Sequence, residues 1–226
     1  SLPPALQAEA AIALGIPEIC ITDHHDPGSE SMTHVHYLLE IPPYLNGIRR
    51  LAEEYEGKLA IRTGIELGLM LREQTELERL EAELPVDFIL GSCHFTDGYD
   101  IYDRAYYAGK TEKEAYFRYL ESTLERIRVF DCFDSLAHLD CILRYGPEKN
   151  RNFRPEDYMD IIDEILKVLI EKGKALECNT AGYKYGLGHP NPHEAILKRT
   201  GMQSLKDCGF RYYTVYRERK PVFLKP

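Results

Sequence analysis

Residues 88–94, Phe88-Ile-Leu-Gly-Ser-Cys-His94, form a short apolar run that ends in a potential metal ligand. Three other runs along the chain have the same design: Ile19-Cys-Ile-Thr-Asp-His24, Ile61-Arg-Thr-Gly-Ile-Glu66 and Phe133-Asp-Ser-Leu-Ala-His-Leu-Asp140. In a barrel of parallel strands, the chemistry lies at the C-terminal ends of the strands. Ligands supplied one per strand would therefore converge on one pocket, which predicts a metalloenzyme.

Short β-branched runs alternate with longer amphipathic stretches, a pattern typical of repeated βα units around a parallel sheet. The predicted strands are Glu18–Thr22, Leu59–Glu66, Asp87–Gly91, Ser135–His138, Ala175–Asn179 and Arg211–Tyr216. The predicted helices are Pro3–Leu14, Pro42–Tyr55, Thr75–Leu84, Thr111 to about Phe130, Pro155 through Leu169, and Pro192–Arg199. Within the fourth helix, Thr111-Glu-Lys-Glu114 has the pattern of a capping box.

Length and composition favour one domain over residues 1–226, because a chain with 44% hydrophobic residues can bury a substantial core. A formal net charge of -9 opposes nucleic-acid binding, which relies on a basic surface. No apolar run reaches transmembrane length, so no membrane partner is expected. The six cysteines include no Cys-x-x-Cys pair. They are expected to be buried free thiols in a reducing compartment, with the cytoplasm as the default location.

The order of the motifs resembles the polymerase-and-histidinol-phosphatase (PHP) family of metal-dependent phosphoesterases. The motifs are Thr22-Asp-His24, Gly64-Ile-Glu66, Gly91-Ser-Cys-His94, His138-Leu-Asp140 and Glu177-Cys-Asn-Thr180. The resemblance implies an α/β fold, specifically a distorted (β/α)7 barrel. Its histidinol-phosphate phosphatase branch is the most similar, through Gly91–Gly98, the run from His138 to Arg144 and the tail Gly209–Tyr216. Hydrolysis of L-histidinol phosphate in histidine biosynthesis is the activity that this branch implies.

Two motifs of the family are missing from the sequence. PHP proteins open with a strand that ends in His-x-His, and a late strand ends in Asp-x-His. Neither appears where expected, so the sequence lacks the runs that would form the first and seventh strands of the barrel. We therefore expect the full polypeptide to contain one such strand before Ser1 and the other between Thr200 and Gly201.

The predicted metal ligands are His24, Glu66, His94 and His138. Imidazole and carboxylate together suit Zn, Mn or Fe, and a carboxylate can bridge two ions. The resemblance makes Glu66 that bridge in a di- or trinuclear cluster, and it assigns His94 and His138 to one ion and His24 to another. Asp23 is a candidate for orienting a neighbouring ligand, or it simply ends its strand.

A small phosphorylated substrate also needs cationic side chains, and the planar fork of arginine matches phosphate oxygens. Arg144, six residues after His138, is the first candidate, and Lys184 is a weaker one. Two alternatives remain open. The chain could act on another small phosphate ester, or it could be a degenerate PHP scaffold without catalysis.

Overall fold

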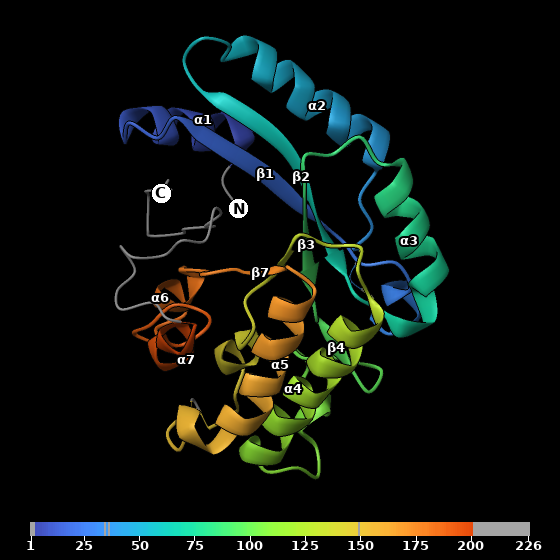
Figure 1. Ribbon diagram of the computed structural model, residues 1–226, viewed down its shortest axis with the longest axis vertical. Helices are drawn as coiled ribbons and strands as arrows, with labels where there is room; N and C mark the ends of the chain where they lie inside the picture. The colour runs from blue at the N-terminus through green and yellow to red at the C-terminus, as the bar shows by residue number, and fades with distance from the viewer. Residues whose placement is uncertain (1–2, 34, 36, 149, 201–226) are drawn as a thin grey trace.

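The computed structural model describes residues 3–33, 35, 37–148 and 150–200 (Figure 1). The predicted strand Arg211–Tyr216 and the predicted break between Thr200 and Gly201 lie outside these ranges. No helix in the described ranges combines the length and the apolar character needed to cross a membrane.

A parallel sheet forms the centre of the fold, with the strand order β1-β2-β3-β6-β7. The strands are β1 (Glu18–His25), β2 (Ala60–Gly68), β3 (Phe88–Ser92), β6 (Ser135–Leu136) and β7 (Ala175–Leu176). All four neighbouring pairs are parallel, so the C-terminal ends of the strands lie at one edge. A small antiparallel hairpin, β4 (Phe95–Thr96) and β5 (Tyr99–Asp100), follows β3.

Helices alternate with the strands, as the sequence pattern predicts. They are α1 (Pro4–Ala13), α2 (Ile41–Glu54), α3 (Gln74–Glu83), α4 (Glu112–Val129), α5 (Met159–Glu171), α6 (Ala181–Lys184) and α7 (Glu194–Arg199). Short 3-10 turns precede or join some of them: η1 (Ser29–Ser31), η2 (Leu71–Glu73), η3 (Arg104–Tyr107), η4 (Cys141–Arg144) and η5 (Pro155–Tyr158). Helix α2 runs along β2, and α4 and α5 lie side by side (Figure 1).

The two faces of β1 have different neighbours, because successive side chains of a strand point to opposite faces. Ile19 and Ile21 are buried in an apolar cluster with residues of α1 and α2. Cys20 and Thr22 face the other way, where a side chain at Gly64 would collide with both of them. His24 lies on this second face and is in register with Glu66 of β2.

The last two strands are shorter than predicted. Ladder hydrogen bonds continue past β6, since the Ala137 N–H donates to the Gly91 carbonyl at 2.9 Å. His138 then adopts a φ of 23°, a backbone conformation that strands do not use. The chain therefore leaves the sheet at the point where the predicted ligand is placed. The remaining strand and helix boundaries agree with the sequence patterns to within a few residues.

The predicted helix cap and the predicted free cysteines are also found in the structure. Thr111 and Glu114 form the predicted capping box, with each side chain bonded to the backbone of the other residue. No disulfide links the cysteines in the described ranges, and four of them are buried: Cys93, Cys132, Cys141 and Cys178.

Candidate metal centre

Glu66 is the centre of a cluster of imidazoles at the C-terminal edge of the sheet. One carboxylate oxygen, Oε1, lies 3.1 Å from His94 Nε2 and 3.0 Å from His138 Nε2. The other oxygen, Oε2, lies 3.7 Å from His24 Nε2. The Ser92 hydroxyl also donates to Oε1, at 2.6 Å. The side chains of the four predicted residues therefore lie together around one carboxylate, and their role as metal ligands stays a prediction.

The sheet register explains the convergence. His24 is paired with Glu66 near the end of β1, while His94 and His138 follow the ends of β3 and β6. Ligand atoms of His24, Glu66 and His94 all lie within 4.8 Å of one another, close enough to share an ion. His138 reaches the same carboxylate oxygen as His94.

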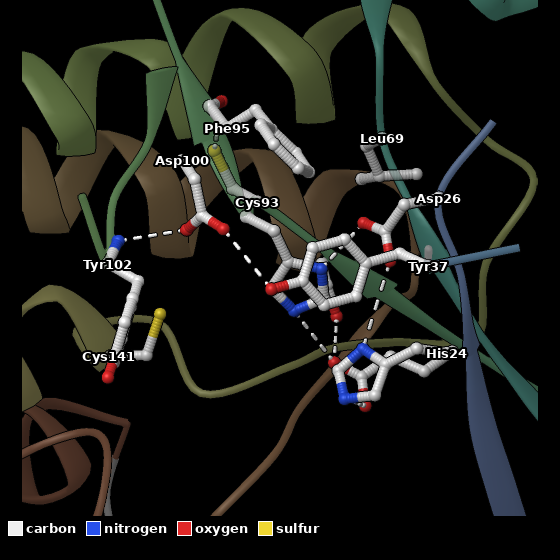
Figure 2. Close-up of polar contacts among 12 residues, drawn as sticks. His24, Asp26, Tyr37, Leu69, Cys93, Phe95, Asp100, Tyr102 and Cys141 are labelled. Atoms are coloured by element: carbon white, nitrogen blue, oxygen red, sulfur yellow. Dashed lines mark hydrogen bonds and ion pairs between the residues drawn. The ribbon is translucent and has the colours of Figure 1, made fainter. Parts of the chain in front are cut away.

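A second carboxylate, Asp26, lies behind two of the imidazoles. Its Oδ1 is 2.7 Å from His94 Nδ1, and its Oδ2 is 3.8 Å from His24 Nδ1. Figure 2 shows the Asp26 carboxylate directed at His24, with the Tyr37 ring close to the cluster and its hydroxyl bonded to Asp100 at 3.2 Å. Asp26 therefore lies on the Nδ1 side of both imidazoles, while Glu66 lies on their Nε2 side.

The charge states of the cluster depend on one another. Burial by itself would raise the Glu66 pKa, but His24, His138 and His94 hold it well below its ordinary value. Burial would lower the His94 pKa, yet Asp26 and Glu66 raise it well above the usual value. For His138, Cys141 and Glu66 outweigh burial and raise the pKa to about 10. Glu66 thus stays ionised, while the raised pKa values of His94 and His138 favour their protonated forms, so a metal ion would have to displace these protons.

Glu177 fixes the backbone that carries His138. Its Oε2 accepts a hydrogen bond from the His138 N–H at 2.8 Å, and Asn179 Nδ2 donates to both of its carboxylate oxygens. Glu177 is only 2% exposed. Glu177 belongs to the Glu177–Thr180 motif, but that pattern alone does not indicate this contact.

Arg144 lies on η4, directly after the His138 loop. Its Nε donates to Asn191 Oδ1 at 2.8 Å, and its guanidinium stacks over the Tyr185 ring at 5.2 Å. Asn191 is itself fixed, because its Nδ2 donates to Asp140 Oδ1 at 2.7 Å. The Arg144 Nη2 is buried and has no hydrogen-bond partner in the described part of the chain. Buried donors in proteins normally have a hydrogen-bond acceptor, so Nη2 is the atom of this loop that needs one.

The other two predicted residues lie at the periphery. Lys184 is exposed at the last position of α6. Asp23 is exposed on β1 and lies near Tyr44 of α2, on the face of the strand opposite His24. The carboxylate that contacts His24 and His94 is Asp26. Strand alternation indicates this difference. Asp23 is adjacent to His24 and points to the opposite face, whereas Asp26 is two residues after His24 and lies on the same side.

Comparison with known proteins identifies the family of the chain. The PHP domain family matches residues 2–181. The histidinol-phosphatase of Lactococcus lactis is 35% identical over 181 residues, which cover 78% of this chain and 65% of that protein. A relative from Thermotoga maritima is 32% identical over 210 residues, covering 89% of this chain and 70% of its own length.

A solved structure shares the fold. It is the histidinol phosphate phosphatase of Lactococcus lactis complexed with zinc, L-histidinol and phosphate. It is 30% identical to this chain, with a TM-score of 0.79, and the match covers 94% of this chain and 78% of that chain.

These matches define the class of the protein: the chain belongs to the PHP domain family of proteins. The chain spans about two-thirds of the length of the Lactococcus lactis relative, and 46% of a second relative, from Clostridium acetobutylicum.

Proposed function

We propose that this protein is a metal-dependent phosphatase that hydrolyses L-histidinol phosphate to L-histidinol and phosphate. The observation that carries the proposal is the convergence of three imidazoles on the buried Glu66 carboxylate. The similarity to a histidinol phosphate phosphatase that holds zinc, L-histidinol and phosphate supports the choice of substrate.

The donor set fits a cluster of divalent ions. Imidazole nitrogen and carboxylate oxygen are ligands of Zn, Mn and Fe. The two oxygens of Glu66 face different histidines, so each oxygen could serve a different ion of a di- or trinuclear cluster. Glu66 would bridge, His94 and His138 would hold one ion, and His24 would hold another. The low pKa of Glu66 keeps it in the charged form that a bridge requires.

Arg144 is the proposed phosphate-binding residue. Its buried Nη2 needs an acceptor, and a phosphate oxygen is the acceptor that guanidinium binds most strongly. The bond from Nε to Asn191 fixes the plane of the fork. Lys184 would add a further positive charge from the end of α6.

The reaction would replace one bond at phosphorus by another. Bound divalent cations would activate a water molecule as the nucleophile and polarise the phosphate oxygens. As the water oxygen attacks, the bond from phosphorus to the histidinol oxygen breaks, and that oxygen leaves with a proton. Arg144 would stabilise the negative charge that spreads over the phosphate oxygens during this step.

The wider setting of the site follows from the same proposal. The parallel sheet would be part of a distorted (β/α)7 barrel, with the cluster at the C-terminal edge of its strands. The partner would be a small phosphorylated molecule, because a net charge of -9 opposes binding of nucleic acid. A biosynthetic phosphatase of this kind would act in the cytoplasm.

Phosphate release by the purified, zinc-loaded protein tests the proposal. We expect faster hydrolysis of L-histidinol phosphate than of other small phosphate esters, and loss of activity in Glu66→Gln. Equal hydrolysis of several esters would favour a phosphatase of broader specificity. Tight zinc binding without hydrolysis of any ester would identify a non-catalytic scaffold and refute the proposal.

A further inference from the structure

Asp26 is buried beside two residues of the proposed metal centre, His24 and His94. It directly follows β1 and is fully buried, at 0% exposure. Its backbone N–H donates to the Tyr37 carbonyl at 2.9 Å, which fixes the turn. An ionised carboxylate in such a place is costly unless it is paired.

Its pairing is with the outer nitrogens of the two histidines. Oδ1 lies 2.7 Å from His94 Nδ1, and Oδ2 lies 3.8 Å from His24 Nδ1. The Nε2 atoms of the same rings face Glu66, at 3.1 Å and 3.7 Å. Each ring is therefore located between two carboxylates, with Asp26 on the outside and Glu66 on the inside.

We propose that Asp26 is a positioning residue that orients His24 and His94 together, so that one buried carboxylate fixes ligands of two different ions. This inference rests on the proposed metal centre. A carboxylate that accepts the Nδ1–H of a ligating histidine fixes the tautomer and makes Nε2 a better ligand. Asp26 would do so for both rings.

The neighbouring strand leaves space for this carboxylate. Gly68, the last residue of β2, faces Asp26 so closely that an added Cβ would overlap Oδ1, and the three nearest atoms to that Cβ all belong to Asp26. Glycine at this position is therefore explained by the position of the Asp26 side chain. Asp26 Oδ2 has no hydrogen-bond partner within the described ranges. On metal binding, a small rotation of His24 would bring its Nδ1 within hydrogen-bonding distance.

Zinc affinity, measured by competition with a chromophoric chelator, tests the inference without reference to phosphatase activity. Asp26→Ala should weaken zinc binding by about 10- to 100-fold. Asp26→Asn should lose less, because its amide oxygen can still accept the Nδ1–H of His94. Glu112→Ala is the matched control. Glu112 is also buried and accepts a backbone N–H from a distant loop, that of Glu148 at 2.8 Å, but it lies outside the centre. Its zinc affinity should equal that of the wild type.

Imidazole nitrogen chemical shifts of the zinc-loaded protein supply the second measurement. Two ligating rings should show a protonated Nδ1 bonded to a carboxylate, and Asp26→Asn should change both signals together. A change in only one ring, or in neither, would overturn the inference even if phosphate release confirms the proposed function. Absence of zinc binding by the wild-type protein would instead refute both.

A double-mutant cycle with Gly68 covers the case in which Asp26→Ala destabilises the fold. Gly68→Ala alone should weaken zinc binding, because the methyl group displaces the carboxylate. In the Asp26→Ala background the same change should have little further effect, since the obstructing side chain is gone. Additive losses would show that Gly68 acts independently of Asp26 and would contradict the inference.

Discussion

The backbone N–H of His138 donates a 2.8 Å hydrogen bond to Oε2 of Glu177, across the ends of β6 and β7. His138 has a φ of 23°, which is unfavourable for a residue with a side chain. The bond to a buried carboxylate stabilises this turn and directs the imidazole at Glu66. Glu177 would thus act on the proposed metal centre through the backbone of His138.

Removing this acceptor should loosen the His138 turn. We expect Glu177→Ala to lower the free energy of unfolding by about 2 kcal/mol, because a buried N–H loses its partner. Zinc affinity should fall as well. Glu177→Gln keeps a carbonyl oxygen at the same place and should restore most of both quantities. Denaturant unfolding and chelator competition measure them. Equal losses in the two variants would show that the carboxylate charge, and not the backbone bond, is what matters.

Arg144 should affect turnover more than stability. Arg144→Ala is expected to reduce kcat/KM for L-histidinol phosphate by about 100-fold, because a donor to the charged phosphate is lost. Arg144→Lys should recover part of the rate, since it restores the charge without the fork. Arg199→Ala, which removes a surface ion pair with Asp163, is the control and should leave the steady-state kinetics unchanged. Wild-type kinetics in Arg144→Ala would reject the assignment of this residue.

Arg126 connects α4 to the strand ends that carry the ligands. It is buried, and its Nε and Nη2 donate to the carbonyls of Leu69 and Phe95, at 2.5 Å and 2.8 Å. Leu69 directly follows β2, and Phe95 begins β4 directly after His94. Arg126→Ala should lower the free energy of unfolding by about 3 kcal/mol, because charged hydrogen bonds to buried carbonyls are lost. Thermal and urea unfolding test this. A loss below about 0.5 kcal/mol, the range of ordinary surface changes, would contradict it.

The capping box of α4 offers a simple test of local stability. Thr111 Oγ1 accepts a hydrogen bond from the Glu114 N–H at 3.2 Å, and Glu114 Oε2 accepts one from the Thr111 N–H at 2.8 Å. Thr111→Ala should cost about 1 kcal/mol of the free energy of unfolding. Thr111→Ser keeps the hydroxyl and should be close to the wild type. A cost shared by both variants would mean that the threonine methyl group, not the cap, is responsible.

Asp97 should contribute to stability in a pH-dependent way. Hydrogen bonds from Arg118 hold the pKa of the Asp97 carboxyl below its usual value. Folding therefore favours the ionised form, so the contribution is present above the unfolded pKa of about 3.9 and is lost as the pH falls through the folded pKa. The pair is partly exposed, so Asp97→Asn should cost less than about 1 kcal/mol at pH 7. Urea unfolding should show this difference shrinking below pH 4. A constant difference would contradict the account.

Local signals in the sequence were enough to predict most of the fold. β1, β2 and β3 each contain a short apolar run, and the start of α4 is marked by its capping box, so their limits depend on nearby residues. The four proposed ligands could be predicted because each lies near or just beyond the end of its own strand. The short lengths of β6 and β7 could not, since they follow from the turn at His138.

The supporting carboxylates were harder to predict for a physical reason. Asp26 contacts His94, 68 residues away, and Glu177 contacts His138, 39 residues away, so no local pattern reveals either pair. Asp23, which the sequence offers either as an orienting residue or as the end of its strand, is exposed on β1. Adjacent residues of a strand point to opposite faces, so Asp23 lies opposite His24. Residues two apart share a face, and this rule favours Asp26.

Anomalous X-ray scattering at the zinc edge, from crystals of the zinc-loaded protein, tests the central claim most directly. We expect zinc peaks about 2.0–2.2 Å from the carboxylate oxygens of Glu66 and about 2.0–2.1 Å from the Nε2 atoms of His24, His94 and His138. One peak should adjoin each oxygen of Glu66. Peaks elsewhere in the molecule, with Glu66 still bonded only to neighbouring side chains, would contradict the assignment of this cluster as the metal centre.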